Sequence, residues 1–151
     1  AHLRPVLSLR AQVVFLKDLP AGAPVGYGGK WTSHRPTRLA TLPIGYNDGV
    51  PYRLGAQGRG SALIRGTRCP IVGAVSMDYS TVDVGHVPGT ELGDVATLIG
   101  RDGVEEIRAE EVANAAGTIP YEVTCSLGAR VHRVFRGGEA GSSIRPREPV
   151  A

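Results

Sequence analysis

Apolar and polar residues alternate along several short segments of this chain, which is the pattern of strands with one buried face. The first segment, residues 7–16, places apolar side chains at every second position: Leu7, Leu9, Ala11, Val13 and Phe15. A turn is expected to follow over residues 17–22. Similar patterns predict strands over 24–25, 38–46, 61–65, 68–75, 80–84, 95–99 and 127–135, with an exposed polar loop over 32–37 and a turn over 100–103.

Only one segment has helical character. Residues 107–117 contain good helix formers, with Glu110 and Glu111 near the start and Gly117 as a stop signal. The 21 glycines and 11 prolines indicate many short strands joined by turns. The pattern therefore predicts a mainly β domain over residues 1–136, a barrel with one short helix. Residues 137–151 are rich in Gly, Ser, Pro and Arg and predict a disordered tail.

Length and charge exclude several classes of protein. The 151 residues correspond to about one domain, and the formal net charge is only +3. The arginines are spread along the chain without a basic run or interleaved aromatics, so nucleic-acid binding is not expected. No secretory signal or long apolar run is present, so we expect a soluble, cytoplasmic protein without membrane contact.

Side chains that commonly do chemistry are scarce. The four histidines lie in a terminus, in loops or beside an arginine, and we expect solvated surface residues: His2, His34, His86 and His132. Cys69 and Cys125 lack metal-ligand spacing and stand in apolar surroundings, so we expect two buried free thiols and no metal site. No phosphate-binding glycine motif follows a strand and opens a helix.

Tyr27 stands out because it is set between glycines in the segment VGYG, in a chain with only 5% aromatic residues. Glycine lets the backbone take positive φ angles and approach other groups closely. A large ring on such a backbone is presented to a partner. Taken alone, the segment is more often a glycine-rich turn with an interfacial tyrosine than a catalytic base, and both interpretations stay open.

Four segments, in order, resemble the C-terminal domain of alanine racemase: VGYG at 25–28, LPIGYNDG at 42–49, PIVGAVSMD at 70–78 and TIPYEV at 118–123. The resemblance implies a Greek-key-like β-barrel. In that family a TIM barrel that binds pyridoxal phosphate through a lysine precedes the β-domain, and two subunits pair so that each β-domain caps the other's active site. This chain resembles only the cap: it is shorter than a TIM barrel, and Lys17 and Lys30 do not match the cofactor-lysine motif.

The resemblance also implies roles for five residues. Tyr27 resembles the base that takes the α-proton of L-alanine, on the face opposite the cofactor lysine. Met77 resembles the residue whose backbone contacts the substrate carboxylate, and Asp78 is part of the same wall or only a turn carboxylate. Tyr46 resembles a tyrosine of the substrate passage and Tyr121 one at the cofactor phosphate, although either could be a half-buried aromatic with a satisfied hydroxyl.

Two positions depart from the family pattern. Gly26 stands where serine is expected, and Val50 where an aromatic is usual. The resemblance implies an isomerase that supplies D-alanine for peptidoglycan, with this chain inactive by itself. The alternatives are a racemase for a broader set of amino acids and a non-catalytic module that keeps the β-domain as an interaction surface. For a cap without its barrel we expect Tyr27, Tyr46, Met77 and Tyr121 to gather on one face, as part of a large uncovered interface.

Overall fold

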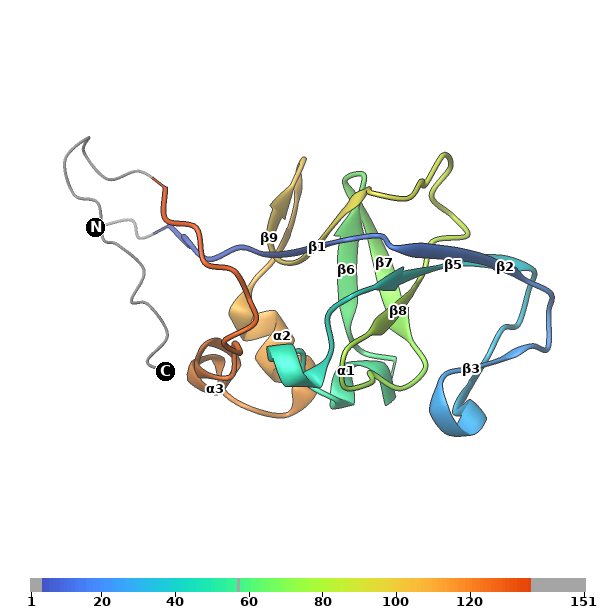
Figure 1. The fold of residues 1–151 in the computed structure, drawn as a ribbon, viewed down its shortest axis with the longest axis horizontal. Helices are drawn as coiled ribbons and strands as arrows, with labels where there is room; N and C mark the ends of the chain where they lie inside the picture. The colour runs from blue at the N-terminus through green and yellow to red at the C-terminus, as the bar shows by residue number, and fades with distance from the viewer. Residues whose placement is uncertain (1–3, 57, 137–151) are drawn as a thin grey trace.

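Most of the strands predicted by the alternating pattern join one curled sheet. The computed structural model describes residues 4–56 and 58–136 (Figure 1). The strand order is β1-β9-β6-β7-β8-β5-β2, with β10 paired to β9 and a separate β3–β4 hairpin. The strands are β1 (Leu9–Gln12), β2 (Phe15–Leu19), β3 (Pro24–Val25), β4 (Trp31–Thr32), β5 (Thr37–Leu42), β6 (Ser61–Ile64), β7 (Thr67–Val72), β8 (Ser80–Asp83), β9 (Val95–Asp102) and β10 (Glu105–Ile107).

The two ends of this sheet belong to one stretch of chain. β1 pairs with β9, and β2 pairs with β5 at the opposite end of the strand order. Between them, the Val13 amide donates to Asp94 O (2.8 Å) and the Val14 amide donates to Thr41 O (3.0 Å). The sheet is therefore bridged into a barrel-like curl, and the prediction of a mainly β fold of this kind is confirmed.

The core fills the inside of the curl. Its largest fully buried side chains include Leu42, Leu63, Ile64, Ile71 and Val82. Leu63 and Ile64 are consecutive on β6 and both fully buried, so both faces of that strand are covered. Burial of each such aliphatic side chain contributes about 1.5–3 kcal/mol, which makes this cluster the main source of stability.

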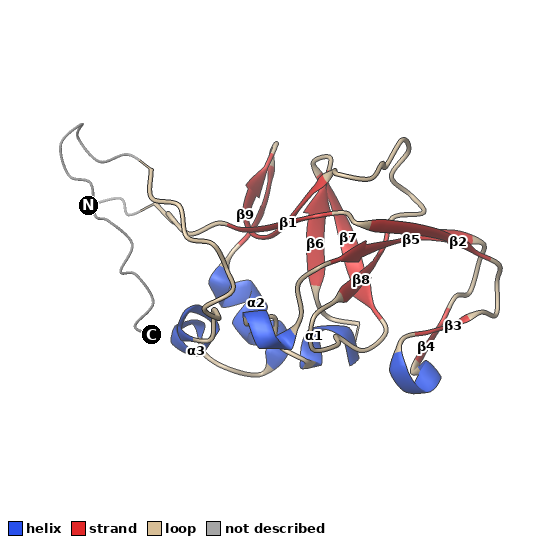
Figure 2. Cartoon of the chain, in the orientation of Figure 1, coloured by secondary structure: helices blue, strands red, loops and turns tan. Residues whose placement is uncertain are grey.

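Helices gather at one edge of the curl (Figure 2). They are α1 (Arg53–Ala56), α2 (Ala109–Ala116) and α3 (Pro120–Cys125), with the short 3₁₀ helix η2 (Tyr46–Asp48). A second 3₁₀ helix, η1 (Tyr27–Gly29), lies apart from them, between β3 and β4. The predicted helix corresponds to α2, which buries Val112, Ala113 and Ala116 and ends at Gly117, whose φ is 72°. The described residues contain no helix long and apolar enough to cross a membrane.

Several local predictions were wrong. The segment expected as one strand over 7–16 is divided between β1 and β2, and the bend leaves Phe15 56% exposed. β9 continues through the predicted turn and pairs with β10, because the turn lies at 103–104. The loop at 32–37 is not uniformly exposed, because Ser33 and Thr37 are buried.

The C-terminal predictions need the largest correction. Residues 127–135 do not form a strand; the carbonyls of Leu127, Gly128 and Val131 accept hydrogen bonds from Arg133 instead of from a neighbouring strand. Cys69 is buried as expected, but Cys125 is exposed at the end of α3. His34, His86 and His132 are exposed as expected, whereas His2 and the tail 137–151 lie outside the described residues.

Candidate functional site

Tyr27 projects from the tip of the β3–β4 hairpin. It opens η1, and the glycines on either side have φ angles of 77° (Gly26) and 76° (Gly28), which residues with a β-carbon rarely adopt. The side chain is 92% exposed. Among the described residues, its hydroxyl makes no hydrogen bond. The local backbone thus directs the phenol outward, and no described residue forms a hydrogen bond with its hydroxyl.

Close glycine contacts fix this hairpin against the segment that follows β7. A β-carbon on Gly26 would lie 2.9 Å from the Ala74 backbone nitrogen, and one on Gly73 would lie 3.2 Å from Val25 O. The serine expected at position 26 would not fit this approach or the positive φ without a shift. The glycine found there is therefore explained by the packing of the hairpin base.

The segment after β5 is joined to the segment after β7 by backbone contacts. The Tyr46 amide donates to Ser76 O (3.0 Å), and the Asn47 amide donates to Met77 O (3.1 Å). A β-carbon on Gly45 would lie only 2.3 Å from Ser76 O, so only glycine allows this approach. Tyr46 and Met77 are 46% and 53% exposed. Two predicted site residues from distant parts of the sequence therefore lie on adjoining loops.

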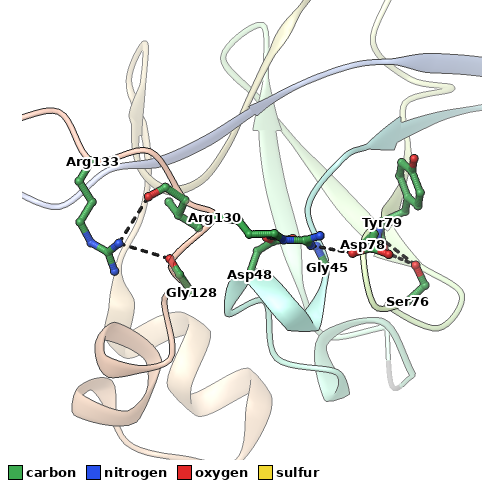
Figure 3. A network of polar contacts seen from close by, with 9 residues as sticks. Gly45, Asp48, Ser76, Asp78, Tyr79, Gly128, Arg130 and Arg133 are labelled. Atoms are coloured by element: carbon green, nitrogen blue, oxygen red, sulfur yellow. Dashed lines mark hydrogen bonds and ion pairs between the residues drawn. The ribbon is translucent and has the colours of Figure 1, made fainter. Parts of the chain in front are cut away.

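An arginine from the irregular C-terminal segment binds both of these loops (Figure 3). Arg130 Nε donates to Asp48 Oδ1 and its Nη2 to Asp48 Oδ2, both at 3.0 Å. The same Nη2 donates to Asp78 Oδ1 at 2.6 Å. Hydrogen bonds to Asp48 and then to Asp78 raise the pKa of Arg130 above its usual value. Asp78 is thus part of an ion-pair network and is more than an isolated turn carboxylate.

Tyr121 lies apart from these loops, on α3, where it is 77% exposed. A cavity of about 520 Å³ separates α2 and α3 from η2 and α1. Tyr46 lines it on one side and Glu122, the neighbour of Tyr121, on the other. The Tyr46 and Tyr52 rings meet edge to face, with centroids 6.4 Å apart. Val50 also lines the cavity and is 2% exposed, so this position serves packing.

The structure therefore brings Tyr46, Met77 and Asp78 together directly and connects Tyr27 to them through the segment after β7. Tyr27, Tyr46, Met77 and Tyr121 are exposed, and Asp78 is half-buried, so none of them lies in the core. Within the described residues, no cluster of three potential metal ligands occurs. Sequence reasoning missed Arg130, because its partners are 82 and 52 residues away and residues 127–135 were predicted to form a strand.

Comparisons with known proteins agree with this architecture. Residues 6–135 match the family model described as alanine racemase, C-terminal domain. Curated relatives include alanine racemases from Syntrophobacter fumaroxidans, 44% identical over 95% of this chain, and from Symbiobacterium thermophilum, 47% identical over 91%. The chain covers 38% and 36% of these two proteins. It therefore spans little more than a third of the curated relatives it matches.

Solved structures of alanine racemases also match this chain in fold. Alanine racemase from the D-cycloserine producer Streptomyces lavendulae superposes with a TM-score of 0.83 at 40% identity, covering 90% of this chain and 35% of that one. Alanine racemase from Bartonella henselae, solved with covalently bound pyridoxal phosphate, has a TM-score of 0.81 at 37% identity, with 89% and 36% covered.

Proposed function

Since the chain belongs to the family of alanine racemase C-terminal domains, we propose that it is the cap domain of a pyridoxal-phosphate-dependent alanine racemase. A larger TIM-barrel domain of the same protein would hold the cofactor, and two copies would pair so that each cap covers the other's active site. The product D-alanine would serve peptidoglycan synthesis in the cytoplasm. The homology of the chain to one end of full-length racemases supports this arrangement.

The presentation of Tyr27 is the single observation that carries the proposal. The phenol is held outward by a glycine-flanked turn, and the turn is itself fixed against the barrel. A surface tyrosine without a role does not require two glycines at positive φ or a close backbone contact at its base. This construction suits a group that must reach a fixed point outside its own domain.

Racemisation removes the α-proton from one face of the amino acid and returns a proton to the other, so it needs an acid/base group on each face. Tyr27 Oη would take the proton of L-alanine on one face, and it would return a proton there when D-alanine is the substrate. The group on the opposite face would come from outside the described chain. Met77 would hold the substrate carboxylate through its backbone, beside Asp78, and Tyr46 would line the substrate passage.

The described residues fit pyridoxal phosphate only in part. Tyr121 offers an exposed hydroxyl that could donate to the phosphate. Neither Lys17 nor Lys30 lies on the loops that carry Tyr46, Met77 and Asp78: Lys17 is in β2, and Lys30 ends the hairpin turn after Tyr27. When bound, the cofactor supplies the electron sink that acidifies the α-proton. The chain's own contribution is therefore a proton-transfer group, substrate contacts and one phosphate donor.

Racemisation assays on the full-length protein test the proposal. We expect interconversion of L- and D-alanine with kcat/KM at least about tenfold above that for larger amino acids, because one or two extra carbons must be rejected by shape. Similar values for many amino acids would instead indicate a broad-specificity racemase. No turnover of any amino acid by the cofactor-loaded protein would contradict the proposal and favour a non-catalytic module.

A further inference from the structure

We propose that Arg130 is a positioning residue that holds the loops of Tyr46 and Met77 in one arrangement. This inference deepens the proposed function and rests on it for its effect on substrate. Arg130 comes from the irregular segment after α3, and it contacts neither loop through backbone pairing. Its guanidinium instead reaches one carboxylate on each loop, Asp48 and Asp78.

The first contact is strong because its acceptor is buried. Asp48 is 5% exposed, and its two oxygens accept the two parallel donors of the guanidinium. Asp48 Oδ2 also accepts the Gly45 amide at 3.0 Å, and Asp48 O accepts the Gly128 amide at 3.1 Å. The arginine, the loop of Tyr46 and the C-terminal segment thus form one unit around this carboxylate.

The second contact ties this unit to the other loop. Arg130 Nη2 donates to Asp78, which directly follows Met77. The Met77 carbonyl accepts a hydrogen bond from the Asn47 amide, and Asn47 belongs to the loop that Asp48 fixes. Met77 is therefore held from both sides by groups that depend on the same guanidinium. A residue that binds the substrate carboxylate through its backbone needs such a fixed peptide orientation.

The contacts predict a specific kinetic signature. The carboxylate is bound in the ground state and the transition state alike, so loosening its site raises KM more than it lowers kcat. For Arg130→Gln in the full-length protein we expect KM for alanine to rise about tenfold or more. The value of kcat is expected to stay within about threefold of wild type. Arg130→Lys keeps the charge but cannot pair with both oxygens of Asp48, so its KM is expected to be intermediate.

Arg133→Gln is the matched control. Arg133 lies three positions further on, and its hydrogen bonds end on carbonyls of its own segment, at Leu127, Gly128 and Val131. We expect KM within about twofold of wild type in this variant. An equal rise of KM in both variants would show that any disturbance of the C-terminal segment is enough to weaken substrate binding. That result would overturn a specific role for Arg130.

A double-mutant cycle tests whether Arg130 acts through Asp78. If it does, Arg130→Gln combined with Asp78→Asn is expected to raise KM no further than Arg130→Gln alone, because both changes break the same contact. Multiplicative effects of the two substitutions on KM would contradict the proposal.

Amide hydrogen exchange on the same full-length variants gives a readout that does not need activity. In Arg130→Gln the Tyr46 and Asn47 amides are expected to exchange at least about tenfold faster than in wild type, with β-strand amides unchanged. Unchanged exchange at both amides would overturn the inference even if the enzyme is active. A wild-type protein that does not racemise alanine would refute the proposed function, and exchange would still decide whether Arg130 holds the loops.

Discussion

Replacement of Tyr27 by phenylalanine in the full-length protein removes one hydroxyl and nothing else. The side chain is 92% exposed, and within the described residues its hydroxyl bonds to no other group. We therefore expect the unfolding temperature to stay within about 2 °C of wild type. A loss of activity without a change in unfolding temperature must then come from the chemistry at Tyr27 Oη. General acid/base groups contribute about a hundred- to ten-thousand-fold in rate, so racemisation should fall by that order in both directions.

The two enantiomers should respond differently in a hydrogen-exchange assay. If Tyr27 is the base proposed above, removal of the α-proton from L-alanine should nearly stop in the variant. Removal from D-alanine would use the group on the other face and should survive, with the proton returned to the same face. In heavy water, followed by NMR, Tyr27→Phe should therefore exchange the α-hydrogen of D-alanine faster than it racemises D-alanine.

Tyr79→Phe supplies the matched control. Tyr79 is also an exposed tyrosine, 52% exposed, and lies just beyond Met77 without an assigned role. Both exchange rates are expected to stay near wild type in this variant. Equal loss of exchange from L- and D-alanine in Tyr27→Phe would refute the assignment of Tyr27 to one face, and would point to a part in positioning the cofactor.

Four further predictions concern the hairpin, the two thiols and the cofactor. Gly26→Ala should reduce activity at least about tenfold, because its β-carbon would meet the Ala74 nitrogen at 2.9 Å and displace the hairpin; wild-type kinetics would contradict this packing argument. Of the two cysteines of this chain, a thiol reagent should label Cys125 in the native protein and both after unfolding, as mass spectrometry of the labelled peptides can show. Burial raises the pKa of the Cys69 thiol from 9.0 to about 11, so this thiol ionises at lower pH in the unfolded chain than in the folded protein. The stability advantage of wild type over Cys69→Ala should therefore be complete below pH 9 and should shrink as pH rises through 11. Denaturant titrations at several pH values measure this difference. This chain alone should bind pyridoxal phosphate weakly or not at all in an absorbance titration. A saturable absorbance change at micromolar cofactor would contradict this prediction.

Sequence patterns predicted the sheet because short apolar segments bounded by glycine and polar turns mark its buried strands, such as β6 and β9, and they predicted α2 because its helix formers are followed by Gly117. They failed over 127–135, where a strand was predicted. There the arginines hydrogen-bond to carbonyls and to distant carboxylates, and no periodicity encodes a partner 82 residues away. α3 was not predicted: it has only six residues, and the proline in its first turn, where proline is favoured, was not recognised as a helix start.

The bridge made by residues 9–19 has a consequence for folding kinetics. Leu9 pairs with Ile99, while Leu16 pairs with Ala40. The hairpin of β6 and β7 can form locally, but closure of the curl must wait until β9 is in place, so much of the loop entropy is lost before the final contacts form. We therefore expect folding on the millisecond-to-second scale typical of barrels with non-local pairing, with β1 among the last strands to gain protection.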